Sequence, residues 1–244
     1  MKKKINGYIE GYYGRLLNWR ERTRIVNKLS SIKMNYYFYA PKDDYFHRFN
    51  WRRNYDKSWE EGFKEFCLNA RLKGIKIIVG VSPGLDFDFT NFIKQLSLNQ
   101  FYKNYKILKK KCERFLKLGA NEIALLFDDL PNNFSSQHIH LNAEGEIHAQ
   151  LSNKLSLNLK KSIYVVPRIY SNELFLDGIN YLKEFGNTIN PNLSCFYCGN
   201  YIVEKSFNKI SLEKISKILP TKIVIWDNFY ANDYCPRRLF LGPL

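Results

Sequence analysis

The sequence has 244 residues, 45% of them hydrophobic and 16% aromatic, which excludes a disordered chain. It carries 38 Lys and Arg against 23 Asp and Glu, and the resulting net charge of +15 raises the question of a nucleic-acid partner. No apolar run reaches the roughly 18 residues that a membrane-spanning helix requires. The five cysteines are an odd number, and no apolar segment follows Lys2–Lys4. Both features favour a cytoplasmic protein with reduced thiols.

The basic residues are spread along the chain rather than gathered in one stripe. The densest run, Lys109–Lys111, lies in a segment whose apolar residues recur at helical spacing from Phe101 to Phe115. We therefore expect these lysines to lie largely on the solvated face of a helix. A nucleic-acid partner is not predicted.

Short apolar runs rich in β-branched and aromatic residues alternate with amphipathic stretches along the whole chain. Several runs are apolar at successive positions, which is typical of parallel strands covered on both faces. The seven predicted strands are Ile5–Ile9, Tyr36–Ala40, Ile75–Val81, Ile123–Phe127, Ile163–Val166, Leu193–Tyr197 and Lys222–Trp226.

Helices are predicted between these strands. Asn18 with Glu21, and Ser58 with Glu61, have the spacing of capping boxes that begin helices. Further helices are expected near residues 143–160, 172–185 and 212–219. No linker or low-complexity segment divides the sequence, so residues 1–244 are predicted to form a single α/β domain.

Polar residues follow nearly every predicted strand, which favours a closed TIM-type (β/α)8 barrel over an open sheet. Residues 11–14 lack the glycine pattern of a dinucleotide-binding loop, and no cofactor is predicted. Only seven strands are recognisable, so we expect an incomplete barrel. A homo-oligomer in which a second copy covers the open seam is one hypothesis.

Two adjacent carboxylates, Asp128 and Asp129, follow the fourth predicted strand. Successive strand residues face opposite sides, so both reach one cavity only if the backbone turns there, and Pro131 favours such a turn. Two neighbouring carboxylates do not ionise together easily, so one would supply an acid and the other a carboxylate. One alternative is a capping Asp beside a surface Asp. Another is a magnesium site, since hard cations bind carboxylates, although no phosphate-binding loop accompanies the pair.

Residues suited to binding a sugar follow the second and seventh strands. Lys42 comes directly after the second strand and can donate hydrogen bonds to hydroxyls. Trp226 ends the seventh strand and Asn228 and Asp233 follow it, where a ring can cover a pyranose face while amides and carboxylates bind its hydroxyls. A solvated loop is the alternative for Lys42.

Two further patterns resemble metal sites but do not predict one. Cys195 and Cys198 form a lone CxxC pair inside a predicted strand, without a second pair to complete a zinc site. His138, His140 and His148 lie in a loop that enters a helix. No metal ion is therefore predicted.

Taken in order, several motifs resemble those of glycoside hydrolase family 84, the O-GlcNAcases and bacterial β-N-acetylglucosaminidases. The resemblance covers nearly the whole chain and implies a TIM barrel that hydrolyses terminal β-linked N-acetylglucosamine with retention. The matching segments are 7–15 (GYIEGYYGR), 39–48 (YAPKDDYFHR), 82–86 (SPGLD), 126–129 (LFDD), 148–150 (HAQ), 226–234 (WDNFYANDY) and 238–243 (RLFLGP).

The resemblance also implies a role for each matching residue. The substrate's own 2-acetamido oxygen would attack the anomeric carbon, so the enzyme needs no nucleophile of its own. Asp128 would orient the acetamido group, and Asp129 would act first as general acid and then as general base. Tyr170 would hold the acetamido oxygen, although the residues around it match only at the Tyr. The sugar hydroxyls would be bound by the Gly11 backbone, Lys42, Asn228 and Asp233.

One departure from the family concerns the end of the sequence. Family members continue into an eighth strand that carries a sugar-binding Asn, and this sequence stops before it. The catalytic Asp pair is retained. The alternative function is therefore a non-hydrolytic module that binds N-acetylglucosamine through a degenerate barrel.

Overall fold

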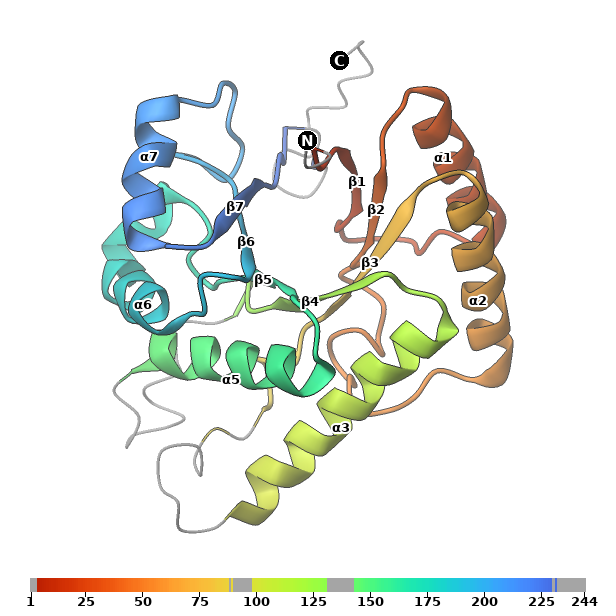
Figure 1. The fold of residues 1–244 in the computed structure, drawn as a ribbon, viewed down its shortest axis with the longest axis horizontal. Coiled ribbons are helices and arrows are strands. Elements are labelled where there is room, and N and C mark those ends of the chain that lie inside the picture. The colour runs from red at the N-terminus through yellow and green to blue at the C-terminus, as the bar shows by residue number, and fades with distance from the viewer. Residues whose placement is uncertain (1–3, 88, 90–97, 131–142, 230, 232–244) are drawn as a thin grey trace. The chain divides into compact units, whose positions relative to one another are not determined.

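The computed structural model describes residues 4–87, 89, 98–130, 143–229 and 231 (Figure 1). The chain divides into two compact units, each described by itself. Unit 1 comprises Met1–Pro83 and Lys103–Leu125, and unit 2 comprises Gly84–Tyr102 and Leu126–Leu244. Among the described residues, seven strands follow one another in the sheet in chain order, and the pairings within each unit are parallel. The predicted parallel α/β organisation is thus confirmed.

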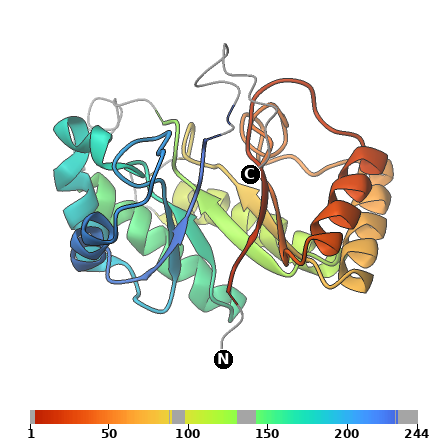
Figure 2. The same ribbon diagram turned by 90° about the horizontal axis from the view of Figure 1, so that it is seen from above.

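Unit 1 contains the first strands and the helices that cover them. In each parallel pair the strands are in register, as between Tyr8 and Tyr37 or between Val79 and Ile123. Helices α1 and α2 lie side by side on one face of these strands (Figures 1 and 2). The elements are β1 (Gly7–Glu10), α1 (Trp19–Ser31), β2 (Tyr36–Tyr39), α2 (Lys57–Leu72), β3 (Lys76–Val81), α3 (Leu98–Leu118) and β4 (Glu122–Leu126), of which α3 and β4 extend into unit 2.

Unit 2 contains the last three strands. The two helices α5 and α6 pack tightly because Gly145 has no side chain, and a Cβ there would lie 2.0 Å from the carbonyl oxygen of Tyr181. The elements are α5 (Glu144–Leu159), β5 (Tyr164–Val166), a 3₁₀ turn (Asn172–Leu174), α6 (Phe175–Thr188), β6 (Ser194–Tyr197), α7 (Lys209–Ile218) and β7 (Lys222–Ile225).

The two predicted capping boxes have different outcomes. Asn18 and Glu21 form the expected reciprocal pair, in which each side chain accepts a hydrogen bond from the other residue's backbone N–H. The prediction for Ser58 was wrong, because Asp56 is the N-cap of α2 and accepts from the backbone N–H of Trp59 at 2.7 Å. Asp is as good an N-cap as Ser, and it lies two residues earlier.

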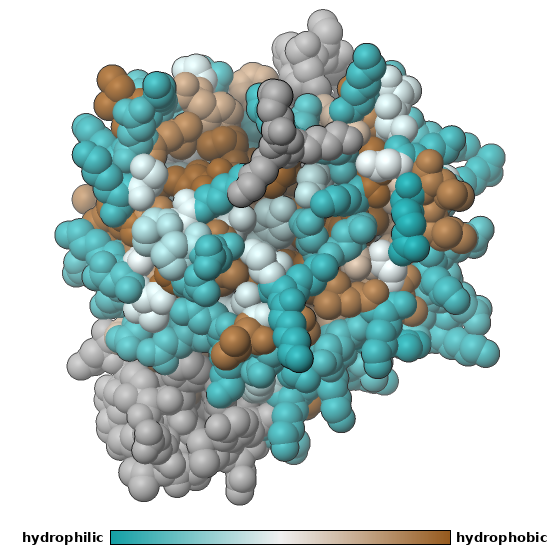
Figure 3. Space-filling view, viewed as in Figure 1, coloured by the Kyte–Doolittle hydropathy of each residue, from teal (hydrophilic) through white to brown (hydrophobic). Residues whose placement is uncertain are grey.

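The lysine-rich helix α3 has one unexpected buried cation. Hydrophilic side chains predominate on the surface over α3 (Figure 3), and Lys110 is exposed as expected. Lys111, however, is 4% exposed and its Nζ donates to the Arg53 carbonyl at 2.6 Å. Burial lowers the pKa of Lys111 to about 8. Amphipathic spacing did not predict this, because the carbonyl partner belongs to a loop 58 residues away in sequence.

No helix in the described part of the chain is both long and apolar enough to cross a membrane.

Candidate active site

The Asp pair stands where the fourth strand ends, in unit 2. The backbone N–H of Phe127 still donates to the Val166 carbonyl at 2.9 Å, so strand-like pairing continues one residue beyond β4. Asp128 is then 6% exposed, while Asp129 is exposed and has a φ of 55°. This left-handed conformation is unusual for a residue other than Gly and turns the backbone at Asp129 itself. Pro131, the residue predicted to cause the turn, lies outside the described residues.

Tyr170 follows β5 and contacts the pair. Its hydroxyl donates to Asp129 Oδ1 at 3.3 Å. Burial, followed by the negative charges of Asp129 and Asp128, raises the pKa of Tyr170 above its usual range. The phenol is therefore neutral and can act as a hydrogen-bond donor. Both carboxylates act on the same phenol, so the structure brings Asp128, Asp129 and Tyr170 together.

Cys198 is a member of this cluster that the sequence reasoning set aside. It comes directly after β6, and its backbone N–H donates to the Tyr170 carbonyl at 2.7 Å. Burial and then the charge of Asp128 raise the pKa of its thiol, so it stays protonated. The sequence signal that could have identified Cys198 is its position just after a strand. Asp128 and Tyr170 also lie shortly after strands.

Asn228, after β7, has its amide held at both ends. Trp226 Nε1 donates to Asn228 Oδ1 at 2.7 Å, and Asn228 Nδ2 donates to Cys198 Sγ at 3.4 Å. The two contacts agree on one orientation of the amide, and they leave one N–H for a ligand. Trp226 is 7% exposed and packs edge-on against Phe196, with ring centroids 5.6 Å apart. Its indole N–H is thus used to orient Asn228.

This contact gives a testable expectation for Trp226→Phe. The variant keeps an aromatic ring but removes the donor to Asn228 Oδ1, so the amide loses its fixed orientation. For the N-acetylglucosaminide that the family resemblance implies as substrate, we expect kcat/KM to fall about tenfold, the equivalent of roughly 1–2 kcal/mol for one hydrogen bond. In an Asn228→Ala background the same substitution should have no further effect. An equal loss in both backgrounds would show that Trp226 acts independently of Asn228.

Of the other predicted sugar-binding residues, two belong to unit 1 and one lies outside the described residues. Gly11 and Lys42 belong to unit 1, where the Lys42 backbone N–H donates to the Tyr12 carbonyl at 3.1 Å and so joins the loops that follow β1 and β2. Lys42 is 3% exposed. Asp233 lies outside the described residues, as does the 238–243 motif.

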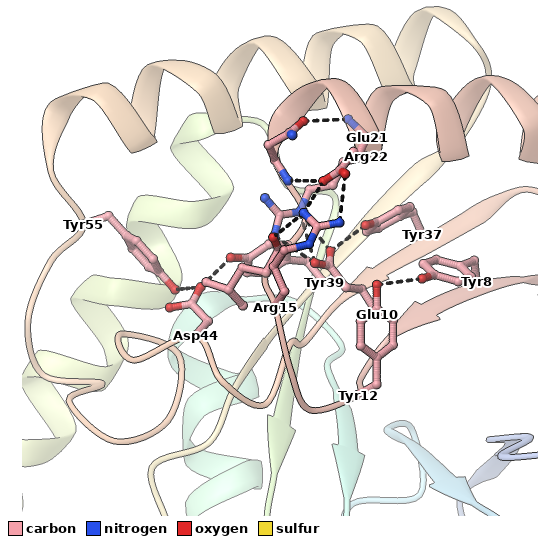
Figure 4. Close-up of polar contacts among 12 residues, drawn as sticks. Tyr8, Glu10, Tyr12, Arg15, Glu21, Arg22, Tyr37, Tyr39, Asp44 and Tyr55 are labelled. Carbon is pink, nitrogen blue, oxygen red and sulfur yellow. Dashed lines mark hydrogen bonds and ion pairs between the residues drawn. The ribbon is translucent and has the colours of Figure 1, made fainter. Parts of the chain in front are cut away.

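Two acidic residues in unit 1, Glu10 at the end of β1 and Asp44 in the loop after β2, are committed to structural contacts (Figure 4). Glu10 pairs with the Arg22 guanidinium at 2.8 Å and accepts from the Tyr37 hydroxyl at 2.5 Å. Asp44 accepts from the hydroxyls of Tyr39 and Tyr55. These partners hold the loops after β1 and β2 in place.

The patterns that resembled metal sites have structural partners. The His148 ring stacks on Phe127 with centroids 4.0 Å apart, and its Nδ1 lies 3.0 Å from the Tyr181 hydroxyl. Cys195 is fully buried, and burial raises the pKa of its thiol to about 12. His138 and His140 lie outside the described residues. Among the described residues, no group of three or more His, Cys, Asp and Glu side chains has a metal-binding arrangement.

In unit 2, the C-terminal ends of consecutive parallel strands thus carry a carboxylate pair, a phenol, a thiol and an amide. This is the strand edge at which TIM-barrel enzymes carry their active sites. The sequence matches the β-N-acetylglucosaminidase family over residues 6–244, and the chain belongs to this family.

Individual relatives agree. The chain is 34% identical over 251 residues to the protein O-GlcNAcase of Mus musculus, covering 99% of this chain and 26% of that protein. It is 33% identical over 254 residues to that of Rattus norvegicus, with the same coverage. The chain thus spans about a quarter of the length of these relatives. Among solved structures, an Asp-to-Asn mutant of a Thermobaculum terrenum O-GlcNAc hydrolase matches with a TM-score of 0.81 and 25% identity, over 94% of this chain and 48% of that one. This match confirms the TIM-type fold.

Proposed function

We propose that residues 1–244 form one glycoside-hydrolase barrel domain that hydrolyses terminal β-linked N-acetylglucosamine with retention of configuration. The observation that carries this proposal is the cluster of Asp128, Asp129 and Tyr170 at the strand ends of a β-N-acetylglucosaminidase family member. The relatives' name, protein O-GlcNAcase, supports a glycosylated protein as the substrate.

The proposed mechanism is substrate-assisted: the 2-acetamido oxygen of the sugar is the nucleophile, so the enzyme does not supply one. Buried Asp128 accepts the acetamido N–H and orients the carbonyl oxygen toward the anomeric carbon. As that oxygen forms its bond to the carbon, the glycosidic bond breaks and Asp129 donates its proton to the departing oxygen. This leaves an oxazolinium ion, whose positive charge the Asp128 carboxylate stabilises.

In the second step Asp129, now ionised, removes a proton from water, and the resulting hydroxide attacks the anomeric carbon and opens the oxazoline. Two inversions at the same carbon give net retention. The exposure of Asp129 suits exchange with water, and the burial of Asp128 suits a group that stays with the sugar. The Tyr170 hydroxyl would donate to the acetamido oxygen, and Gly11, Lys42, Asn228 and Asp233 would bind the sugar hydroxyls.

A comparison of two substrates tests this mechanism. An aryl N-acetyl-β-glucosaminide should be hydrolysed, while the matching aryl β-glucoside, with a 2-hydroxyl in place of the acetamido group, should not. Loss of the participating oxygen removes the intramolecular attack, which contributes several orders of magnitude in rate. Similar release of the phenol from both sugars would refute substrate assistance. Binding of N-acetylglucosamine in calorimetry without turnover would instead support the alternative, a sugar-binding module.

We further propose a cytoplasmic location. The four cysteines in the described residues, Cys67, Cys112, Cys195 and Cys198, are all free, as is usual in a reducing compartment.

A further inference from the structure

Two exposed aromatic rings stack in the loop that follows β2 in unit 1. Tyr45 is 55% exposed and Phe49 is 50% exposed. Their ring centroids lie 6.3 Å apart with an interplanar angle of 28°. Single exposed apolar side chains are ordinary, but two that stack form a contiguous apolar surface of the kind found at binding sites. We call Tyr45 and Phe49 the aromatic shelf.

The loop that carries the shelf is fixed by buried contacts. The backbone N–H of His47, at the centre of the loop, donates to Asp44 Oδ1, and the His47 ring Nδ1 lies 2.9 Å from the Gly80 carbonyl. Burial lowers the pKa of His47 to about 4, so this ring is neutral and its Nδ1–H can donate to that carbonyl. The end of the loop is held by Lys111, which donates to the Arg53 carbonyl. The loop is therefore already ordered in the folded protein, and binding a partner would cost little further conformational entropy of the loop.

The shelf adjoins the loops that carry the proposed sugar-binding residues of unit 1. Arg48 is 7% exposed and lies 5.3 Å from the centroid of the Phe49 ring, beneath the shelf. The same guanidinium donates to the Tyr13 hydroxyl at 3.2 Å, in the loop that begins at Gly11. Lys42 lies three residues before Tyr45. The shelf is thus built into the same pair of loops as Gly11 and Lys42.

The charge of this loop indicates what it would bind. The whole loop between β2 and α2, residues 40–56, contains Lys42 and three Arg against three Asp. The three Asp side chains accept hydrogen bonds within the fold, Asp43 from the Gly14 N–H, Asp44 from the Tyr55 hydroxyl and Asp56 from the Trp59 N–H. Arg53 is exposed, so its guanidinium is accessible to a carboxylate. The Arg53 guanidinium lies 5.9 Å from the centroid of the Phe46 ring, and that ring packs edge-on against Tyr45. An exposed cation next to apolar rings suits an acidic polypeptide better than a second, uncharged pyranose.

We propose that the aromatic shelf and Arg53 bind the polypeptide part of a glycosylated substrate, with a preference for acidic residues near the modified side chain. This rests on the proposed function, which places the sugar at Gly11 and Lys42. The shelf would then increase the affinity for the polypeptide, and the Asp pair would cleave the glycosidic bond.

The test compares three substrates: an acidic glycopeptide carrying β-N-acetylglucosamine on Ser, the same peptide with Lys replacing its acidic residues, and an aryl N-acetyl-β-glucosaminide. For Tyr45→Ala/Phe49→Ala we expect kcat/KM on the acidic glycopeptide to fall about tenfold or more, while the aryl substrate is unaffected. Arg53→Gln should lower kcat/KM severalfold on the acidic glycopeptide alone. The matched control is Leu72→Ala, which removes a side chain that is 78% exposed at the C-terminal end of α2. It should change none of the three.

Each other outcome overturns the proposal in a recognisable way. An equal fall on all three substrates would mean that the shelf supports the fold rather than the polypeptide. A loss confined to a chitin-type oligosaccharide would make it a sugar subsite, and no change at all would make it an ordinary surface. If the wild-type chain does not cleave the aryl substrate, the proposed function fails. Calorimetry of the acidic glycopeptide against wild type and the double variant then still decides whether the shelf binds it.

Discussion

Asp129→Asn is expected to lower kcat for an aryl N-acetyl-β-glucosaminide by roughly 10²–10⁴-fold, the usual contribution of general acid–base catalysis. An amide neither gives a proton to the leaving oxygen nor takes one from water. Asn is also among the residues that best tolerate the left-handed φ of 55° at this position, so the backbone turn should persist. Steady-state kinetics with a series of aryl leaving groups would measure the effect.

The size of this loss should depend on the leaving group. A phenol of high pKa needs more proton transfer in order to leave, so cleavage of its glycosidic bond should slow more than cleavage of the bond to a phenol of low pKa. Asp56→Asn is the matched carboxylate-to-amide control, because Asn caps a helix as well as Asp and α2 should begin as before. If both variants retain wild-type kcat, Asp129 is not the general acid.

Arg22→Met is expected to lower the free energy of unfolding by about 3–5 kcal/mol, the range for breaking one side of a buried ion pair. Arg22 Nε and Nη2 donate to the Glu10 carboxylate at 2.9 and 2.8 Å, and the two side chains are 4% and 0% exposed. Removal of the guanidinium would leave the Glu10 carboxylate buried, with the Tyr37 hydroxyl as its remaining donor among the residues drawn in Figure 4. Urea denaturation of wild type and variant would measure the difference.

Two further variants test whether the loss of stability comes from the burial of the ion pair or from the loss of any ion pair. Arg15→Met breaks the Arg15–Glu21 pair, whose Arg side chain is 70% exposed, and should leave the free energy of unfolding nearly unchanged. Glu10→Gln/Arg22→Met removes both buried charges and should recover much of the stability lost in Arg22→Met. If the double variant is no more stable than Arg22→Met, the loss comes from packing of the Arg22 side chain against Trp19 and Tyr39 rather than from the uncompensated carboxylate.

Much of the fold was predictable because its signals are local. The seven strands and most helices follow from apolar runs and amphipathic spacing within about ten residues. The capping box of Asn18 and Glu21 is read correctly because its partners are three residues apart. The Asp pair could be found as chemistry because both carboxylates follow one buried strand, and adjacent positions in sequence must be close in space.

The sequence by itself therefore determined the parallel α/β class, the order of the strands and the residues that carry the proposed chemistry. Only the tertiary structure decided which side chains each polar residue contacts. Glu10 ends β1 and Asp44 lies in the loop after β2, and their carboxylates accept hydrogen bonds from Arg22, Tyr37 and Tyr55. Cys198, set aside as half of a CxxC pair, orients Asn228 from 30 residues away. A hydrogen bond depends on distance in space, and these partners meet only after the strands have paired.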